Sequence, residues 1–178
     1  MNMNLLLAGF GGQGILFTGK VVAYAGMLDG KEVSWLPSYG PEMRGGTANC
    51  SVCVSDSPIG SPLVTAPDVL IAMNLPSLEK FEKTVVPGGL IILDSSIVDA
   101  KVKRNDVKAI YLPATRLALD SGLKGMANMV IAGRLFKETK FCSEEAFLEG
   151  VRKSIPARKQ ELLDSNMAAV KIGMKSGE

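Results

Sequence analysis

The stretch that decides the fold is Asn4-Leu-Leu-Leu-Ala-Gly-Phe-Gly-Gly-Gln-Gly14, in which a short apolar run leads directly into a cluster of glycines. An apolar run without alternation predicts a strand that is buried on both faces, as at the centre of a parallel sheet. Residues 15–28 have the spacing of a helix, and Asp29-Gly30 closes it, because glycine readily adopts the left-handed cap. A strand, a glycine turn and a helix in this order are typical of the first unit of a doubly wound α/β sheet.

The remaining chain continues the alternation of strands and helices. Pro76-Ser77 begins one predicted helix, Pro113 leads into another, and Ser143 is a favourable N-cap for a third. We predict strands at residues 32–36, 47–54, 69–73, 90–93 and 107–112, and helices at residues 76–85, after 113, and at 125–138, 144–155 and 157–175. These elements predict one domain over residues 1–178, a doubly wound, Rossmann-like α/β fold with a mostly parallel sheet and a helical C-terminal part.

The composition excludes several classes of function. Of the 178 residues, 47% are apolar, which is enough to bury a full core. Lys and Arg number 20 and Asp and Glu 18, and this balance gives no electrostatic reason to expect a nucleic acid or a membrane as partner. The chain has no histidine, which excludes histidine-ligated metals and imidazole acid–base chemistry. The N-terminus lacks the positive region of a signal peptide, and no apolar run could span a membrane, so we expect a cytoplasmic protein.

Three cysteines are too few for the usual four-thiolate iron–sulfur cluster, and we expect no metal site in this chain. Cys50-Ser-Val-Cys53 has the spacing of a redox motif, but both thiols fall inside a predicted strand. Residues three apart on a strand point to opposite faces, which predicts two buried structural thiols. Cys142 stands alone before a predicted helix, and we expect it to be inert.

The glycine turn has the spacing Gly-x-Gly-x-x-Gly at Gly9, Gly11 and Gly14. We assign the tight turn and close approach to a ligand to Gly9 and Gly11, and close packing of helix on strand to Gly14. The following helix would offer free N–H groups to a phosphate. A dinucleotide would also need an acidic residue at the end of the second strand, where the chain has residues 36–38, Leu-Pro-Ser. A dinucleotide, another anion and a ligand-free turn therefore stay open as alternatives.

A second glycine-rich segment, Ser38-Tyr-Gly-Pro-Glu-Met-Arg-Gly-Gly46, follows the second predicted strand. The topology rule predicts that it lies beside the glycine turn. Arg44 could bind a phosphate or carboxylate through two parallel hydrogen bonds, or could pair with Glu42 as a structural alternative. Exposed aromatic side chains near these loops, Phe10 and Trp35 among them, indicate a surface that contacts another protein.

Polar side chains near other strand ends are weaker candidates. Asp68, Asn74 and Asp94 are each predicted near the end of a strand, where they could reach the crevice. A pair of carboxylates for acid–base catalysis needs a defined separation, and no spacing in this chain predicts one. We therefore expect no catalytic residue here.

The glycine turn, residues 38–46, the segment from Ser61 to Asp68, and Asn128-Met129 with Gly133 together resemble the gamma subunit of 2-oxoacid:ferredoxin oxidoreductases. The resemblance covers essentially the whole chain. It implies a subunit of a heteromeric enzyme of anaerobic metabolism, with alpha, beta and in some cases delta subunits as partners. Such enzymes oxidatively decarboxylate a 2-oxoacid, transfer the acyl group to coenzyme A and pass electrons to ferredoxin through other subunits.

The resemblance also implies where the cofactors lie. Thiamine diphosphate would sit between alpha and beta and the iron–sulfur clusters in beta or delta, so that this chain alone binds none of them. Coenzyme A and the alpha subunit are expected near eight residues of the two glycine-rich segments: Gly11, Gly12, Gln13, Gly14, Tyr39, Gly40, Arg44 and Gly45. A stand-alone NAD(P)-binding reductase and a coenzyme A-binding module are the alternatives. The 2-oxoacid stays open among pyruvate, 2-oxoglutarate, branched-chain oxoacids and indolepyruvate.

Overall fold

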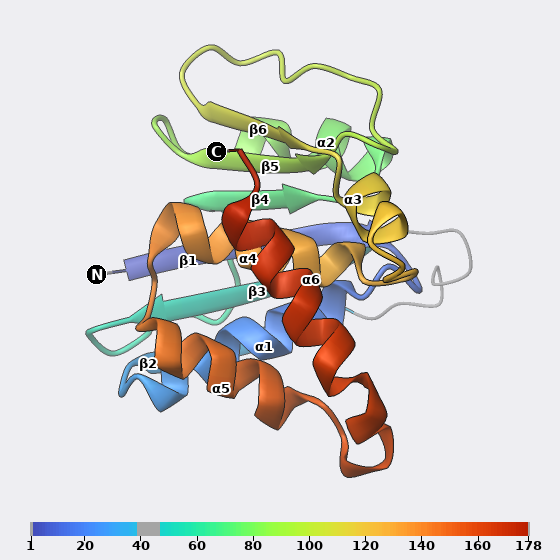
Figure 1. Ribbon diagram of the computed structural model, residues 1–178. Helices are drawn as coiled ribbons and strands as arrows, with labels where there is room; N and C mark the ends of the chain where they lie inside the picture. The colour runs from blue at the N-terminus through green and yellow to red at the C-terminus, as the bar shows by residue number, and fades with distance from the viewer. Residues whose placement is uncertain (1, 39–46, 178) are drawn as a thin grey trace.

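A six-stranded sheet forms the centre of the molecule (Figure 1). The computed structural model describes residues 2–38 and 47–177. Across the sheet the strands follow the order β2-β3-β1-β4-β5-β6. The strands are β1 (Asn2–Phe10), β2 (Glu32–Ser38), β3 (Thr47–Ser55), β4 (Val69–Ala72), β5 (Leu90–Asp94) and β6 (Lys108–Leu112).

The mostly parallel sheet predicted from the sequence is confirmed, with one strand reversed. β1, β4, β5 and β6 pair in parallel, whereas β3 pairs antiparallel with both β1 and β2. β2 therefore points in the same direction as β1 but is separated from it by β3. β2 and β3 form an antiparallel pair that joins the rest of the sheet through β3.

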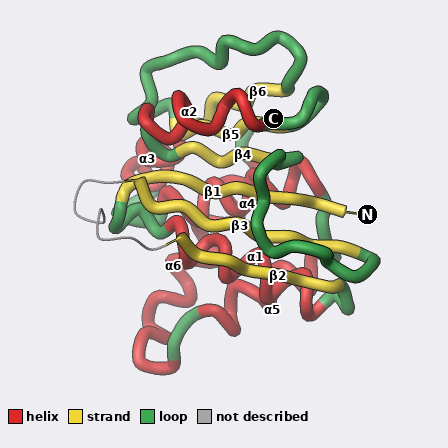
Figure 2. The backbone as a smooth tube through the Cα atoms, turned by 180° about the vertical axis from the view of Figure 1, so that it is seen from behind, coloured by secondary structure: helices red, strands yellow, loops and turns green. Residues whose placement is uncertain are grey.

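Helices cover both faces of the sheet unequally. One face carries α1 (Ile15–Leu28), α3 (Ala114–Asp120), α4 (Ala127–Thr139), α5 (Glu144–Ser154) and α6 (Leu163–Lys175) (Figure 1). The other face carries α2 (Leu75–Phe81) and the short 3₁₀ segment η2 (Glu82–Thr84) (Figure 2). Alternate residues of β1 serve the two cores, because Leu5 and Leu7 pack under the larger layer and Leu6 under the smaller. The prediction of a doubly wound domain with a helical C-terminal part is confirmed.

The C-terminal helices differ in detail from the sequence prediction. Ser143 caps α5 as expected, because its hydroxyl accepts a hydrogen bond from the Ala146 N–H at 3.2 Å. The helix predicted at 157–175 is divided into a 3₁₀ segment, η3 (Ala157–Leu162), and α6. The backbone of Lys159 leaves the helical region inside η3, with φ −129°, which breaks the helical run. Within the two described ranges, no helix is long and apolar enough to cross a bilayer.

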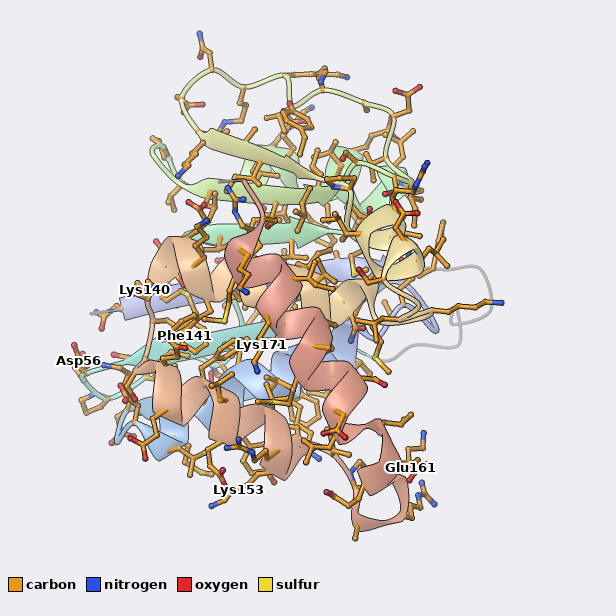
Figure 3. The ribbon with its side chains drawn as sticks, viewed as in Figure 1. Asp56, Lys140, Phe141, Lys153, Glu161 and Lys171 are labelled. Carbon is orange, nitrogen blue, oxygen red and sulfur yellow. The ribbon has the colours of Figure 1, made fainter. Side chains whose placement is uncertain are left out.

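Three phenylalanines lock the larger core where α4 turns into α5. The rings of Phe136 and Phe147 stack with centroids 4.6 Å apart, and Phe141 contacts both edge-on, with centroids at 6.2 and 5.9 Å. Phe141 is labelled in Figure 3, beneath the helical layer. All three side chains are buried. Offset-stacked and edge-on contacts of this kind add to the free energy gained from burial alone.

Two glycines let α4 and α6 cross in direct backbone contact. A Cβ on Gly133 would lie 2.0 Å from the Val170 carbonyl oxygen, and one on Gly173 would lie 1.8 Å from the Val130 carbonyl oxygen. Neither backbone oxygen can move without displacing its helix. The crossing distance of these two helices therefore depends on both residues being glycine.

The two thiols of the Cys-x-x-Cys spacing lie on opposite faces of the sheet, as predicted. Cys50 belongs to the larger core and Cys53 to the smaller. Burial raises the pKa of the Cys50 thiol to about 12, and burial likewise raises the pKa of Cys142 to about 12. Both groups are therefore neutral thiols at physiological pH and poor nucleophiles.

The α4–α6 crossing yields a stability prediction. Gly133→Ala should lower the free energy of unfolding by about 3 kcal/mol, because steric overlap with the Val170 carbonyl outweighs the roughly 1 kcal/mol gained in helix propensity. Gly60→Ala is the control, since a Cβ at Gly60 has no atom within 4 Å, and it should change stability by less than about 0.5 kcal/mol. Urea titration measures both values, and equal effects of the two substitutions would contradict the tight crossing.

The thiols yield a prediction of pH dependence. Both thiols have a pKa of about 12 in the folded chain, against an ordinary value of 9.0, so the free energy of unfolding keeps its full value below pH 9 and falls as the pH rises toward 12. At pH 8 the thiolate fraction of Cys50 and Cys142 should be roughly a thousandfold lower in the folded than in the unfolded chain. Alkylation followed by peptide mass mapping should label both residues rapidly only in denaturant. Rapid labelling of the native protein would show that they are accessible and reactive.

Candidate functional site

The candidate site lies at the carboxyl ends of β1 and β4. β1 and β4 are parallel neighbours, and the helices that follow them, α1 and α2, cover opposite faces (Figures 1 and 2). Connections that diverge in this way leave a crevice at the carboxyl ends of the two strands. The glycine turn, residues 10–14, lies at this point because it directly follows β1.

The backbone of the turn is left-handed at Gly12, with φ 92°, and at Gly14, with φ 77°. Residues with a Cβ rarely adopt these angles, so both positions require glycine. Gly11 lies in the tight turn as predicted, which the Gln13 N–H closes onto the Phe10 carbonyl at 3.2 Å, but the left-handed angle falls on Gly12, and Gly9 is still part of β1. Gly9 instead makes room for the turn's own side chain, since a Cβ there would lie 2.7 Å from Oε1 of Gln13.

The Gln13 side chain ties the turn to two strands. Its Oε1 accepts a hydrogen bond from the Phe10 N–H at 2.6 Å, and its Nε2 donates to the Met73 carbonyl at 2.8 Å. Both polar atoms of this amide are therefore used inside the protein. Gln13, a predicted cofactor-binding residue, holds the ends of β1 and β4 together at the crevice.

Gly14 makes room for a helix and not, as predicted, for a strand. A Cβ on Gly14 would lie 2.4 Å from Nδ2 and 2.7 Å from Cγ of Asn128, which comes from the first turn of α4. The side chain of Asn128 is 7% exposed. The close packing that Gly14 permits therefore joins the start of α1 to the start of α4.

The start of α1 offers a group of free backbone donors. Gly14 is the N-cap and supplies no side chain, and the first turn of α1 contains no acidic residue. The N–H groups of Gly11, Gly12, Gly14 and residues 15–17 have no hydrogen-bond partner within residues 2–38 and 47–177. Unpaired N–H groups and the positive end of the helix dipole together favour an anion at this position.

A cavity of about 280 Å³ opens beside these donors. Gly12, Gly14 and Asn128 line one side of it, and η3 with the start of α6 lines the other. The segment η3, marked by Glu161 in Figure 3, projects beyond the sheet and brings the exposed side chains of Arg158 and Lys159 to the rim. A phosphate in this cavity would meet backbone donors on one side and cationic side chains on the other.

The sequence does not predict the four polar side chains that line this cavity: Asn128, Arg158, Lys159 and Asn166. Asn166 is 4% exposed on α6, and its Nδ2 donates to the Leu162 carbonyl at 2.8 Å. The sequence signal that could indicate two of these residues is an asparagine on an otherwise apolar helix face, which occurs at Asn128 and again at Asn166. No local pattern indicates that residues of α4 and α6 would line one cavity with the start of α1.

The second predicted segment begins and ends at the same edge of the sheet. Tyr39, Gly40, Arg44 and Gly45 lie outside the described residues. The flanking residues are described: Ser38 pairs with Asn49 across β2 and β3, and Thr47 pairs with Phe10 across β3 and β1. Thr47 is therefore adjacent to the end of β1 that leads into the glycine turn, whereas Ser38 lies one strand farther away, at the same edge of the sheet.

The polar residues at other strand ends have structural partners. Asp94 is fully buried, and its carboxylate accepts hydrogen bonds from the Thr115 hydroxyl at 2.6 Å and from the Ser96 N–H at 3.1 Å. Asn74 caps α2 through the Ser77 N–H at 2.8 Å. Asp68 precedes β4 and accepts from the Asn4 N–H at 2.7 Å, so it lies at the amino edge of the sheet and not at the crevice. These groups hold the fold and offer no free carboxylate to a substrate.

Metal ligands are not gathered in the part of the chain that the structure describes. No three His, Cys, Asp or Glu side chains there lie close enough to hold a metal ion. The donors at the crevice are backbone N–H groups, amides and cationic side chains, which suit an anion better than a cation.

The chain is similar to known proteins over nearly its whole length. Residues 4–176 match the family model "Pyruvate ferredoxin/flavodoxin oxidoreductase". The ketoisovalerate oxidoreductase subunit VorA of Methanothermobacter thermautotrophicus is 39% identical over 94% of this chain, which spans only 35% of that relative. The 2-oxoglutarate synthase subunit KorC of Methanocaldococcus jannaschii is 35% identical over 90% of this chain and 88% of its own.

A solved structure shows the same fold. The keto/oxoacid ferredoxin oxidoreductase gamma subunit from Geobacter sulfurreducens superposes with a TM-score of 0.83 and 27% sequence identity, covering 97% of this chain and 96% of the other. The family model and the superposition thus both cover nearly the whole chain. The chain therefore belongs to the pyruvate ferredoxin/flavodoxin oxidoreductase family.

Proposed function

We propose that this chain is the gamma-type subunit of a 2-oxoacid:ferredoxin oxidoreductase and binds coenzyme A for that enzyme. The observation that carries the proposal is the likeness to KorC and to the Geobacter sulfurreducens gamma subunit over nearly their full lengths. The match covers 88% of KorC and 96% of the gamma subunit. The catalysed reaction is the oxidative decarboxylation of a 2-oxoacid, with acyl transfer to coenzyme A and electron transfer to ferredoxin.

The chemistry of the crevice supports a binding role. Coenzyme A carries a pyrophosphate and a 3′-phosphate, and these anions suit the free N–H groups at the start of α1 and the cations Arg158 and Lys159. The remaining predicted contacts, Tyr39, Gly40, Arg44 and Gly45, would approach the same ligand from the segment between β2 and β3. Gln13 would act by holding the turn in shape, because its side-chain amide is already bonded.

The side chains of the chain are poorly suited to covalent or proton-transfer chemistry. The sequence has no histidine, and burial raises the pKa values of Cys50 and Cys142 far above neutral pH. Asp94 is enclosed by its hydrogen-bond donors. We therefore assign the reacting groups, thiamine diphosphate and the iron–sulfur clusters to the alpha, beta and, where present, delta subunits.

A dinucleotide fits the site less well. The acidic residue that would bind the ribose hydroxyls is expected at the end of β2, where the chain has Ser38. Asp29 has the right spacing but lies at the far end of α1, where its carboxylate accepts from the Ser143 N–H at 3.1 Å. Hydrogen bonds from the Ser143 side chain and from its N–H keep the pKa of Asp29 below its ordinary value and hold the carboxylate away from the turn.

Reconstitution tests the proposed function. The chain should copurify with thiamine-dependent and cluster-bearing subunits on coexpression, and the complex should reduce ferredoxin with one of a panel of 2-oxoacids only when coenzyme A is present. The isolated chain should show no turnover. Turnover by the chain alone, or full activity of a complex that lacks it, would contradict the proposal.

A charge reversal at the rim tests the coenzyme A site. Lys159→Glu should raise the KM for coenzyme A in the assembled complex by roughly fivefold to tenfold at low salt, because it places a carboxylate beside a bound phosphate, and the effect should shrink as salt increases. Lys171→Glu is the matched control, since Lys171 is also an exposed lysine but lies farther along α6 and outside the cavity (Figure 3). Equal KM values for the two variants would argue against phosphate binding at η3.

A further inference from the structure

The carbonyl of Gly14 accepts hydrogen bonds from an unusual number of donors. The Thr18 N–H donates to it at 2.9 Å, as the first bond of the helix, and the Thr18 hydroxyl donates at 3.1 Å. The Nδ2 of Asn128 approaches the same oxygen at 3.4 Å and donates to the Thr18 hydroxyl oxygen at 3.2 Å. Two side chains therefore fix one carbonyl at the start of α1.

That carbonyl determines the direction of a donor at the crevice. The Gly14 C=O and the Ile15 N–H belong to the same planar trans peptide, so they point in opposite directions. Thr18 and Asn128 hold the oxygen toward the helix, which turns the Ile15 N–H toward the open end of α1. A free N–H that is already aimed binds an anion without first losing rotational freedom.

Asn128 also fits Gly14 by shape. Its side chain is 7% exposed and occupies the space that a Cβ at residue 14 would need. Asn128 belongs to α4 and is separated from Gly14 by 114 positions in the chain. It therefore holds the turn from the helical layer, whereas Gln13 holds it from the ends of β1 and β4.

We propose that Asn128 is a positioning residue for coenzyme A, which aims the anion-binding N–H groups of the glycine turn through the Gly14 carbonyl and Thr18. The inference rests on the proposed function for the identity of the ligand. Asparagine suits the role because its amide supplies a neutral N–H donor in a buried position. An aspartate of the same shape would accept from Thr18, repel the Gly14 carbonyl and add negative charge to the wall of the cavity.

Asn128→Asp in the assembled complex is the principal test. The KM for coenzyme A should rise about tenfold or more, while kcat and the KM for the 2-oxoacid stay within about twofold of the wild type. The difference should narrow at low pH, because protonation removes the charge and restores a donor. An unchanged KM for coenzyme A in the assembled variant would overturn the inference.

Thr18→Val is a second variant, with nearly the same shape and no hydroxyl. It should raise the KM for coenzyme A by a few fold, and combining it with Asn128→Asp should give less than the product of the two effects, since both act through one carbonyl. Thr139→Val is the control, because it removes a side-chain bond to the Leu135 carbonyl at the opposite end of α4. The control should leave both KM values unchanged, and an equal rise there would show a general effect of destabilising α4.

Hydrogen exchange separates this inference from the proposed function. In the isolated chain, Asn128→Asp should accelerate amide exchange in the peptide covering residues 14–20 relative to wild type, and Thr139→Val should not. Unchanged exchange there would overturn the positioning role whatever the complex does. A wild-type complex that ignores coenzyme A would instead contradict the proposed function, even if the exchange result is as expected.

Discussion

The start of α1 leaves backbone N–H groups unpaired at the carboxyl end of the central strand, and the architecture of the site follows from that constraint. Such donors are stable at a helix end only when water or a ligand reaches them, so the chain around them must stay open. The turn must also be held in one conformation, because its two left-handed residues, Gly12 and Gly14, are glycines and have a flexible backbone. Side-chain amides from two directions, Gln13 and Asn128, provide this rigidity without covering the donors.

The reversed strand β3 gives the sheet a second connection to the same edge. Because β2 and β3 are antiparallel, β2 ends and β3 begins at the edge of the sheet where β1 ends, with Thr47 paired to Phe10 and Ser38 one strand farther away. The larger helical layer contributes another part of the candidate site, since η3 and α6 lie on the face of the sheet that α1 also covers. Stretches that are distant in sequence from the glycine turn, η3 and the start of α6, therefore line one cavity with it, and Arg158 and Lys159 bring cationic side chains to that cavity.

The sequence is a good guide where the pattern is local. The apolar run at residues 4–8 with its glycines predicts a central strand, a turn and a helix, and the period of two along residues 47–54 places Cys50 and Cys53 on opposite faces. Local patterns do not report strand direction, so β3 was not recognised as antiparallel. Asp68 lies at a strand end as predicted, but it precedes β4 and is therefore at the edge of the sheet opposite the crevice.

Contacts between distant elements could not be predicted for a physical reason. Gly14 was assigned to packing against a strand because the usual motif pairs helix with strand, yet its neighbour is Asn128 on α4, and nothing local to residues 9–14 specifies that partner. Arg158 and Lys159 were hidden inside a predicted continuous helix, whereas the break at Lys159 creates the projecting segment that carries them to the cavity.

The distance between the two walls of the cavity depends on the crossing of α4 and α6, which contribute residues to these walls. α4 carries both Asn128 and Gly133, and α6 carries both Asn166 and Gly173. Because the two glycines bring these helices into backbone contact, the separation of the asparagines is set by a contact that no flexible side chain can adjust. A ligand that bridges the start of α1 and the start of α6 therefore binds to a nearly rigid frame, and the binding energy at the turn depends on core packing one to two helical turns away.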